Sequence, residues 1–172
     1  MFLAIALAAA VALGAVALVW WARAGAGCEQ GSFESPRFGY CVRTPSGWTA
    51  VAAEDAGTPL DRFFLPDGAA TITVTAVPLT QGQDLARFEQ FVRGYVEDAG
   101  AAADTSRPVT VDGVEGVAFD VRLEGDDGQV RSREVLFARD GIAWRVTLAD
   151  EQIGFEANAH RLDEMLESWR FA

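Results

Sequence analysis

The hydrophobic and polar positions divide the chain into one apolar stretch and a longer, patterned remainder. From Phe2 to Trp21 no residue is charged and none is proline, and most are Ala, Val, Leu or Ile. A helix of this length rises about 30 Å, which matches the hydrocarbon core of a bilayer. Trp20 and Trp21, followed by Arg23, suit the headgroup boundary. The pattern therefore predicts a single transmembrane helix over residues 2–21, within an anchor or uncleaved signal at residues 1–23.

Two kinds of processing remain open for this segment. Ala22-Arg23-Ala24 and Ala24-Gly25-Ala26 both offer small residues at the spacing of a signal-peptide cleavage site, although the apolar run is longer than the usual core of about 7–15 residues. Acylation of Cys28, as in a lipoprotein, is the other alternative, although Gly25 stands where a lipobox has an aliphatic residue. Residues 24–35 are expected to form a linker.

Beyond the linker the pattern is that of one α+β domain with a mainly antiparallel, twisted sheet. Residues 38–42 are expected to form an edge strand, and the turn at 45–48 brings Trp48 toward the core. Residues 62–65 and 71–77 form the first hairpin. Four Asp-Gly pairs separate runs rich in β-branched and aromatic residues, and this dipeptide favours tight turns because it tolerates positive φ. They are Asp67-Gly68, Asp112-Gly113, Asp127-Gly128 and Asp140-Gly141.

Apolar residues recur at helical spacing in two segments, which predicts two helices whose apolar stripes belong to the core. The first lies between Asp84 and Asp98 and is followed by Gly100; the second lies near the end of the chain. The stripes are Leu85, Phe88, Val92, Tyr95 and Val96 in the first, and Phe155, Ala159, Leu162, Leu166 and Trp169 in the second.

Cross-strand spacing predicts which residues share a face of the sheet. If Asp140-Gly141 is a two-residue turn, Phe137 pairs with Trp144 and Val135 with Val146. If the preceding loop centres on Asp127, Val117 pairs with Phe137 and Phe119 with Val135. The opposite face then carries four charged side chains, which are either a solvated ladder of ion pairs or a docking surface for a polar or charged partner. These candidate binding residues are Asp120, Arg122, Glu134 and Arg145.

Composition excludes several kinds of chemistry. The chain has no lysine, which removes Schiff-base catalysis and a phosphate-loop lysine, and its one histidine, His160, cannot build a His-rich metal site. His160 lies among charged residues and is expected to be solvated. A net charge of −11 argues against nucleic acid as a partner. No cofactor and no metal site are predicted.

The two cysteines bear on the compartment. Cys28 and Cys41 both lie just outside the predicted anchor, and in an oxidising compartment such a pair can close a short loop. Two free thiols are the alternative. The lone Arg23 argues mildly for a cytoplasmic side, but the cysteines favour a domain on the extracytoplasmic side of the cytoplasmic membrane.

The order of features resembles the PsbP/Mog-like α/β/α sandwich domains, which include bacterial envelope lipoproteins of the LpqN and DcrB kind. The resemblance rests on Tyr40-Cys41-Val42, on Pro45-Ser46-Gly47-Trp48, on the segment Val111-Asp112-Gly113-Val114-Glu115-Gly116-Val117-Ala118 and on the closing Ser168-Trp169-Arg170-Phe171. It covers nearly all of residues 36–172 and implies a binding or assembly factor that is not an enzyme.

These observations together predict a membrane-anchored binding or assembly factor of the cell envelope with a protein partner. The alternatives are a hydrolase with a carboxylate pair, because acidic residues are abundant, and a spacer domain without its own ligand.

Overall fold

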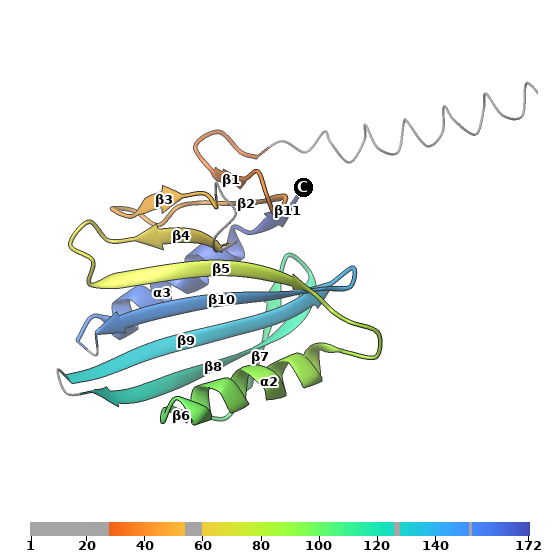
Figure 1. Ribbon diagram of the computed structural model, residues 1–172. Coiled ribbons are helices and arrows are strands. Elements are labelled where there is room, and N and C mark those ends of the chain that lie inside the picture. The colour runs from red at the N-terminus through yellow and green to blue at the C-terminus, as the bar shows by residue number, and fades with distance from the viewer. Residues whose placement is uncertain (1–27, 54–59, 126–127, 152) are drawn as a thin grey trace, which may run out of the picture.

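The computed structural model describes residues 28–53, 60–125, 128–151 and 153–172, and it contains two antiparallel sheets and two helices (Figure 1). The strand order of the main sheet is β3-β4-β5-β10-β9-β8-β6, and β7 also pairs with β8. These strands are β3 Thr49–Val51, β4 Leu60–Phe64, β5 Ala70–Pro78, β6 Ala102–Ala103, β7 Arg107–Val111, β8 Val114–Gly125, β9 Gly128–Arg139 and β10 Ile142–Glu151.

The second sheet has three short strands: β1 (Phe33–Ser35), β2 (Tyr40–Val42) and β11 (Arg170–Phe171). The strand predicted at residues 38–42 is therefore present as β2, but it is the central strand of this small sheet and not an edge strand. The predicted linker at 24–35 ends earlier than expected, because Phe33 pairs with Val42 and its ring contacts the ring of Phe63 at 4.9 Å.

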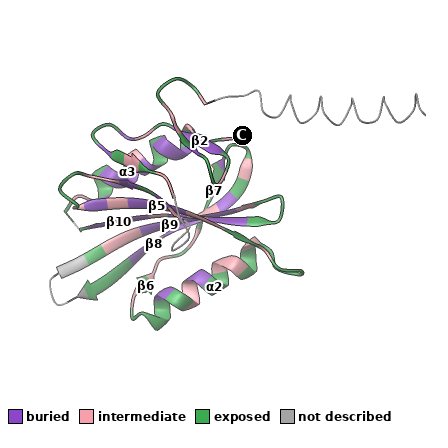
Figure 2. Ribbon diagram, turned by 45° about the horizontal axis from the view of Figure 1, so that its top comes forward, coloured by how far each residue is buried: buried purple, intermediate pink, exposed green. Residues whose placement is uncertain are grey.

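The predicted helices are both present. α2 (Leu85–Asp98) begins after Asp84, whose carboxylate accepts a hydrogen bond from the backbone N–H of Arg87, an N-cap that satisfies one of the free donors of the first turn. α3 spans Phe155–Glu167. α2 packs over β6, β8 and β9, and α3 packs over β5, β9 and β10 on the other side of the sheet, which confirms the predicted sandwich (Figures 1 and 2).

The two helices bury cores of different size. The core beneath α3 is rich in aromatic residues, with Trp169 fully buried between Tyr40, stacked at 4.0 Å, and the edge of Phe137. Trp48 also joins this core, as predicted from the turn at 45–48. The core beneath α2 is smaller and consists of Val92, Val96, Phe119, Val121 and Leu136.

The hairpin between β9 and β10 has the predicted register. Asp140 and Gly141 both adopt positive φ, 52° and 77°, and Phe137 lies opposite Trp144. Val135 likewise lies opposite Val146. The aromatic side chains of these two strands consequently point to the same face, toward α3.

The predicted register between β8 and β9 is wrong by one residue. Gly116 lies opposite Phe137 where Val117 was expected, and Ala118 lies opposite Val135 where Phe119 was expected. Because successive side chains of a strand alternate between faces, a slip of one residue moves every side chain of β8 to the other face. Phe119 therefore points toward α2, and Gly116, with no side chain, fits against Phe137.

The transmembrane helix predicted at residues 2–21 lies outside the described residues. Neither helix within the described ranges is long and apolar enough to cross a bilayer.

Candidate functional site

The face of the main sheet that carries α2 is only partly covered. α2 lies over the β6-β8-β9 side, so neither helix of the described residues lies over β4, β5 and the middle of β10 on this face (Figure 1). Strand pairing continues the α2 side from Leu136 through Arg145 and Thr75 to Leu60, since these residues lie opposite one another in turn. We call this surface the open face. Its strand residues are Leu60, Arg62, Phe64, Thr71, Thr73, Thr75, Val77, Arg145 and Thr147.

A buried ion pair lies where the open face meets the edge of α2. The Arg145 guanidinium donates to both carboxylate oxygens of Glu134, with Nε–Oε2 at 2.8 Å and Nη2–Oε1 at 3.0 Å, and the Thr147 hydroxyl donates to Oε2 at 2.7 Å. Glu134 is 2% exposed. The hydrogen bonds to Glu134 and the charge of Glu134 raise the pKa of Arg145, although its partial burial acts in the opposite direction. The pair fixes Arg145 at this position as a permanent cation.

Aromatic side chains of α2 border the open face. Val92 and Val96 point into the small core, and the helical period therefore places Phe88, Phe91 and Tyr95 on one flank of the helix. Arg93, on the opposite flank of α2, donates to the backbone carbonyl of Asp104 just after β6, so Phe91 and Tyr95 lie on the flank toward β10. Phe91 is 70% exposed and Tyr95 is 63% exposed. The prediction that Tyr95 belongs to the core stripe is wrong, because α2 covers the sheet only as far as β9 and the flank that carries Tyr95 lies beyond the covered strands.

The predicted grouping of four charged residues on one face is also wrong, for the same reason as the register. Glu134 and Arg145 are paired on the α2 side, whereas Asp120 and Arg122 point to the α3 side. Arg122 pairs there with Asp104 at 2.6 Å. With the observed register of β8 and β9, the Glu134–Arg145 pair and the Arg122–Asp104 pair lie on opposite faces of the sheet.

Asp120 is the centre of an arginine cluster on the α3 side. Arg133 donates two hydrogen bonds to its carboxylate, at 2.8 and 3.2 Å, and Arg131 and Arg107 lie at 3.6 and 3.8 Å. Burial by itself raises the pKa of Asp120, but the hydrogen bonds and charge of Arg133 and the charges of Arg107 and Arg131 hold it below 3.8. The Arg131 guanidinium also lies 3.9 Å from the ring centre of Phe155, at the start of α3. The cluster thus joins β8 and β9 to α3.

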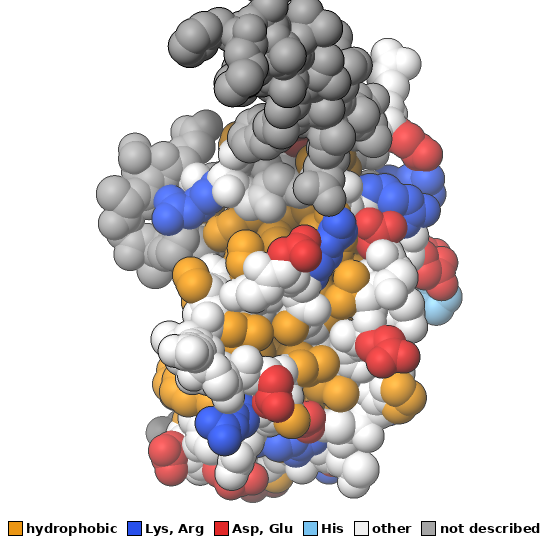
Figure 3. Space-filling model, turned by 90° about the vertical axis from the view of Figure 1, so that its right-hand side faces the viewer, with side chains coloured by type: hydrophobic (Ala, Val, Ile, Leu, Met, Phe, Trp, Pro, Cys, Tyr) orange, Lys and Arg blue, Asp and Glu red, His pale blue; other side chains and the backbone are white. Residues whose placement is uncertain are grey.

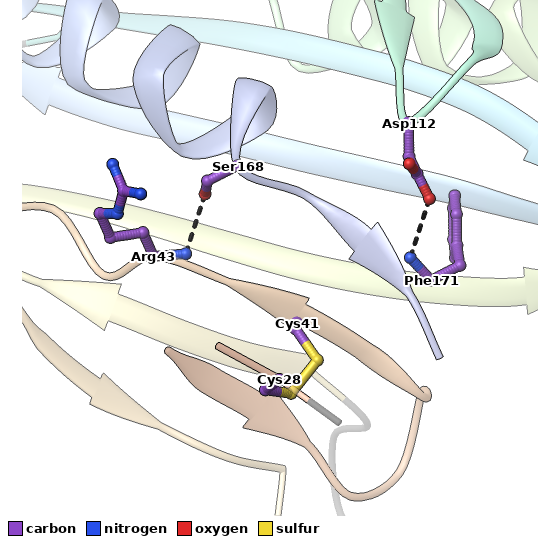
Figure 4. Close-up of a disulfide and its surroundings, with 6 residues drawn as sticks. All are labelled: Cys28, Cys41, Arg43, Asp112, Ser168 and Phe171. Atoms are coloured by element: carbon purple, nitrogen blue, oxygen red, sulfur yellow. Dashed lines mark hydrogen bonds between the residues drawn. A yellow bond between two sulfur atoms is a disulfide. The ribbon is translucent and has the colours of Figure 1, made fainter. Parts of the chain in front are cut away.

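The predicted disulfide is present and lies beside a cavity. Cys28 and Cys41 are bonded, with their Cα atoms 5.5 Å apart, so the chain before β1 is tied to the middle of β2 (Figure 4). The cavity has a volume of about 740 Å³ and extends from the disulfide to the C-terminal end of α3. Three arginines and three glutamates line it, which leaves no net charge to select a ligand.

Hydrogen bonds between segments that are distant in the sequence hold β11 and the C-terminal end of α3 in place. The backbone N–H of Arg43 donates to the Ser168 hydroxyl at 2.8 Å, and the backbone N–H of Phe171 donates to the Asp112 carboxylate at 3.0 Å (Figure 4). β11 is therefore held between β2 and the turn that joins β7 to β8.

The buried carboxylates outside these clusters have structural partners. Asp61 accepts a hydrogen bond from the Tyr40 hydroxyl at 2.7 Å and another from the backbone N–H of Ala53 at 2.8 Å. Burial, followed by the charge of Asp61, raises the pKa of Tyr40 far above its usual value. Asp150 accepts from the Asn158 amide at 2.7 Å. No cluster of three or more metal-ligating side chains that could hold a metal ion is found within the described ranges.

Comparisons with known proteins bear on the fold alone. No protein-family model and no curated protein matches the sequence. Among solved structures, LpqN, described as involved in cell envelope biogenesis of Mycobacterium tuberculosis, has a TM-score of 0.67 at 13% identity, covering 82% of this chain and 89% of that one.

Two further solved structures show the same likeness. The cyanobacterial PsbP of Synechocystis has a TM-score of 0.60 at 15% identity, over 86% of this chain and 96% of that one. The Ran-binding protein Mog1p of Saccharomyces cerevisiae has a TM-score of 0.57 at 13% identity, over 81% and 94%. The resemblance found in the sequence is thereby confirmed: the chain has the PsbP/Mog-like fold.

Proposed function

We propose that this chain is a membrane-anchored, non-catalytic binding or assembly factor on the extracytoplasmic side of the cytoplasmic membrane. The open face, bordered by Phe91 and Tyr95, is its contact surface for a protein partner. The observation that carries the proposal is the exposure of these two rings, 70% and 63%, beside an uncovered part of the sheet.

The side chains of the open face favour a protein as the ligand. Aromatic residues and arginine are enriched at protein interfaces, because they combine a large contact area with directed hydrogen bonds. Exposed Phe91 and Tyr95 supply the area, and Arg62 and Arg145 supply the donors. The threonines of β5 add short hydroxyl groups that leave the sheet surface flat. A partner that fits would offer apolar side chains to the two rings and carboxylates to Arg62.

The charge of the open face favours an acidic region of that partner. The whole chain carries a net charge of −11, yet the charged strand residues of the open face are Arg62 and Arg145. Glu134 neutralises the charge of Arg145 in their ion pair, so the remaining positive charge among the strand residues of the open face is that of Arg62. Complementary charge would orient the partner during encounter and disfavour binding to the acidic remainder of the molecule.

The proposed location rests on the sequence, on the disulfide and on the likeness to LpqN. The apolar run at residues 2–21 is long enough to span a bilayer. The bonded Cys28 and Cys41 suit an oxidising compartment. The likeness to LpqN supports an envelope role, and the likeness to the Ran-binding Mog1p supports protein binding on this fold.

The location is tested by proteolysis. In intact spheroplasts that express the full chain, added protease is expected to digest the domain while a cytoplasmic control protein survives. The mass of the mature protein then distinguishes a retained anchor from cleavage and from acylation of Cys28. Complete protection of the domain until the membrane is opened would contradict the proposed orientation.

The contact surface is tested by photo-crosslinking in cells. A photoreactive phenylalanine analogue at position 91 is expected to join the chain to one envelope protein. The same analogue at His160, an exposed position on α3 at the other side of the sheet, is the matched control and is expected to give no such product. Equal crosslinking from both positions, or none from position 91, would contradict the assignment of the open face.

A further inference from the structure

Apolar side chains gather at one end of the molecule, where β5 ends, β10 begins and the β1–β2 turn lies. Figure 3 looks at this end and shows hydrophobic side chains grouped over the middle of the surface, with charged side chains scattered among them. Pro78 and Ile142 are exposed, and Phe38 and Phe171 are half-buried. We call these four residues the strand-end patch.

Contacts between rings and strands hold the strand-end patch together. Phe38 and Phe171 both pack against Trp144, with ring centres 5.9 and 5.4 Å away. Ile142 lies opposite Pro78 in the sheet and on the same face as Trp144, two residues before it. The patch is therefore one surface built around a buried tryptophan, and its position is fixed by the core.

Arginine side chains lie over the strand-end patch. The Arg37 guanidinium is 5.9 Å from the ring centre of Phe38, and that of Arg139 is 4.4 Å from the ring centre of Phe171. Arg139 also contacts Asp140, and Arg170 contacts Asp112 at 3.9 Å. Three arginines and two aspartates thus surround the patch in a chain whose net charge is −11. Apolar side chains ringed by arginine suit the boundary between lipid headgroups and acyl chains.

The path of the chain brings the strand-end patch close to the predicted anchor. The Cα atom of Cys28 is 5.5 Å from that of Cys41, which is three residues from Phe38. Six residues lie between Trp21 and Cys28, and a fully extended chain over these seven Cα–Cα steps spans only about 25 Å. A tether this short would hold the patch at an effective concentration of roughly millimolar beside the bilayer, so that even a weak contact forms.

We propose that the strand-end patch rests on the surface of the membrane and binds lipids with anionic headgroups. Ile142, Pro78 and the edges of Phe38 and Phe171 would enter the headgroup layer, and Arg37 and Arg139 would bind lipid phosphates. This inference rests on the proposed anchoring. Its consequence is a fixed orientation: the strands stand upright on the membrane, and the open face is presented sideways to a partner in the same envelope.

Spin labels on the full chain in vesicles test the inference. One variant carries a label at Ile142→Cys, within the patch, and the matched control carries it at Val130→Cys. The Ile142 side chain is 37% exposed and the Val130 side chain is 44% exposed. Ile142 lies opposite Arg139 on β9, and Val130 is nine residues farther along that strand, about 30 Å away. The Cys28–Cys41 bond is kept oxidised throughout. The vesicles contain phosphatidylcholine with phosphatidylglycerol, or phosphatidylcholine alone.

The expected result is a label at position 142 that is at least about fivefold more accessible to oxygen than to a water-soluble nickel chelate, with the reverse at position 130. The preference at position 142 should weaken in vesicles of phosphatidylcholine alone. If the chain floats with the vesicles but both labels face water, the patch inference fails and the anchor stands.

Two other outcomes also overturn the inference. A chain that does not float with either kind of vesicle removes both the anchor and the docked patch. A label at position 142 that is shielded from both relaxation agents and broadened by a second label, whatever the lipid, would show that another copy of this chain covers the patch.

Discussion

Glu134 on β9 and Arg145 on β10 form a two-point ion pair across neighbouring strands, with the carboxylate buried and the guanidinium half-buried at the border of the open face. Glu134→Gln removes the charge and leaves Arg145 in a partly desolvated position. We expect a loss of about 2–4 kcal/mol in the free energy of unfolding, measured by urea denaturation. Thr147→Val, which removes only one hydrogen bond to the same carboxylate, should cost about 1 kcal/mol. Equal, negligible effects of both variants would show that the pair contributes nothing to stability.

Asp120 makes stability depend on acid pH. Its pKa in the folded state is held below 3.8, its ordinary value, so its contribution is present above that value and is lost as the pH falls through the lowered pKa. Asp120→Asn should therefore cost about 1–3 kcal/mol at pH 7, and the difference from the unmodified chain should vanish in acid. Asp140→Asn, at an exposed ion pair, is the control and should cost under about 0.5 kcal/mol. A difference for Asp120→Asn that is the same at every pH would contradict the ion-pair explanation.

The disulfide should stabilise the domain without affecting the open face. Its two cysteines are separated by 13 positions in the sequence, and closing a loop of this size is worth about 3 kcal/mol in the chain-entropy model. Reduction of the full chain is expected to lower its melting temperature, whereas the variant with both Cys28→Ser and Cys41→Ser should melt at that lower temperature with or without reductant. If both cysteines of the unmodified chain are alkylated under denaturing conditions without reductant, the bond is absent.

Two glycines are expected to respond in opposite directions to alanine. A Cβ atom at Gly116 would lie 2.6 Å from the Leu136 carbonyl oxygen and 3.0 Å from the Phe137 Cβ, so Gly116→Ala should cost about 1–3 kcal/mol. Gly94 lies in α2 with open space around it, and Gly94→Ala should stabilise by about 0.5–1 kcal/mol. Thermal melts of both variants check the pair. Tolerance of alanine at Gly116 would contradict the observed register of β8 and β9.

The elements were predictable from the sequence wherever local chemistry determines them. The Asp140-Gly141 turn sets the register of β9 and β10 because both residues must adopt positive φ. The apolar stripes located α2 for the same reason, because helical spacing is a local property. The disulfide followed from the number and position of the cysteines.

The open face was missed because two of its determinants are not local. The register between β8 and β9 depends on a loop across which Gly125 lies opposite Gly128, whereas a loop centred on Asp127 would place Gly125 opposite Gln129. The spacing of Val117, Phe119 and Val121 could have indicated it, since these alternating apolar residues form the floor beneath α2. How far α2 extends across the sheet depends on tertiary packing. The helical period could not show that Tyr95 lies beyond the covered strands.

The role of the open face in binding is tested by the affinity of the crosslinked partner for two double variants of the full chain. Phe91→Ala with Tyr95→Ala removes both rings from the border of the open face, and both positions are exposed, so the fold should survive. The control, Val130→Ala with Ile153→Ala, removes exposed apolar side chains elsewhere. We expect the first variant to bind at least about 30-fold more weakly, corresponding to about 2 kcal/mol, and the second to bind with unchanged affinity. Unchanged affinity in the first variant, with its melting temperature preserved, would contradict the assignment of the open face as the binding surface.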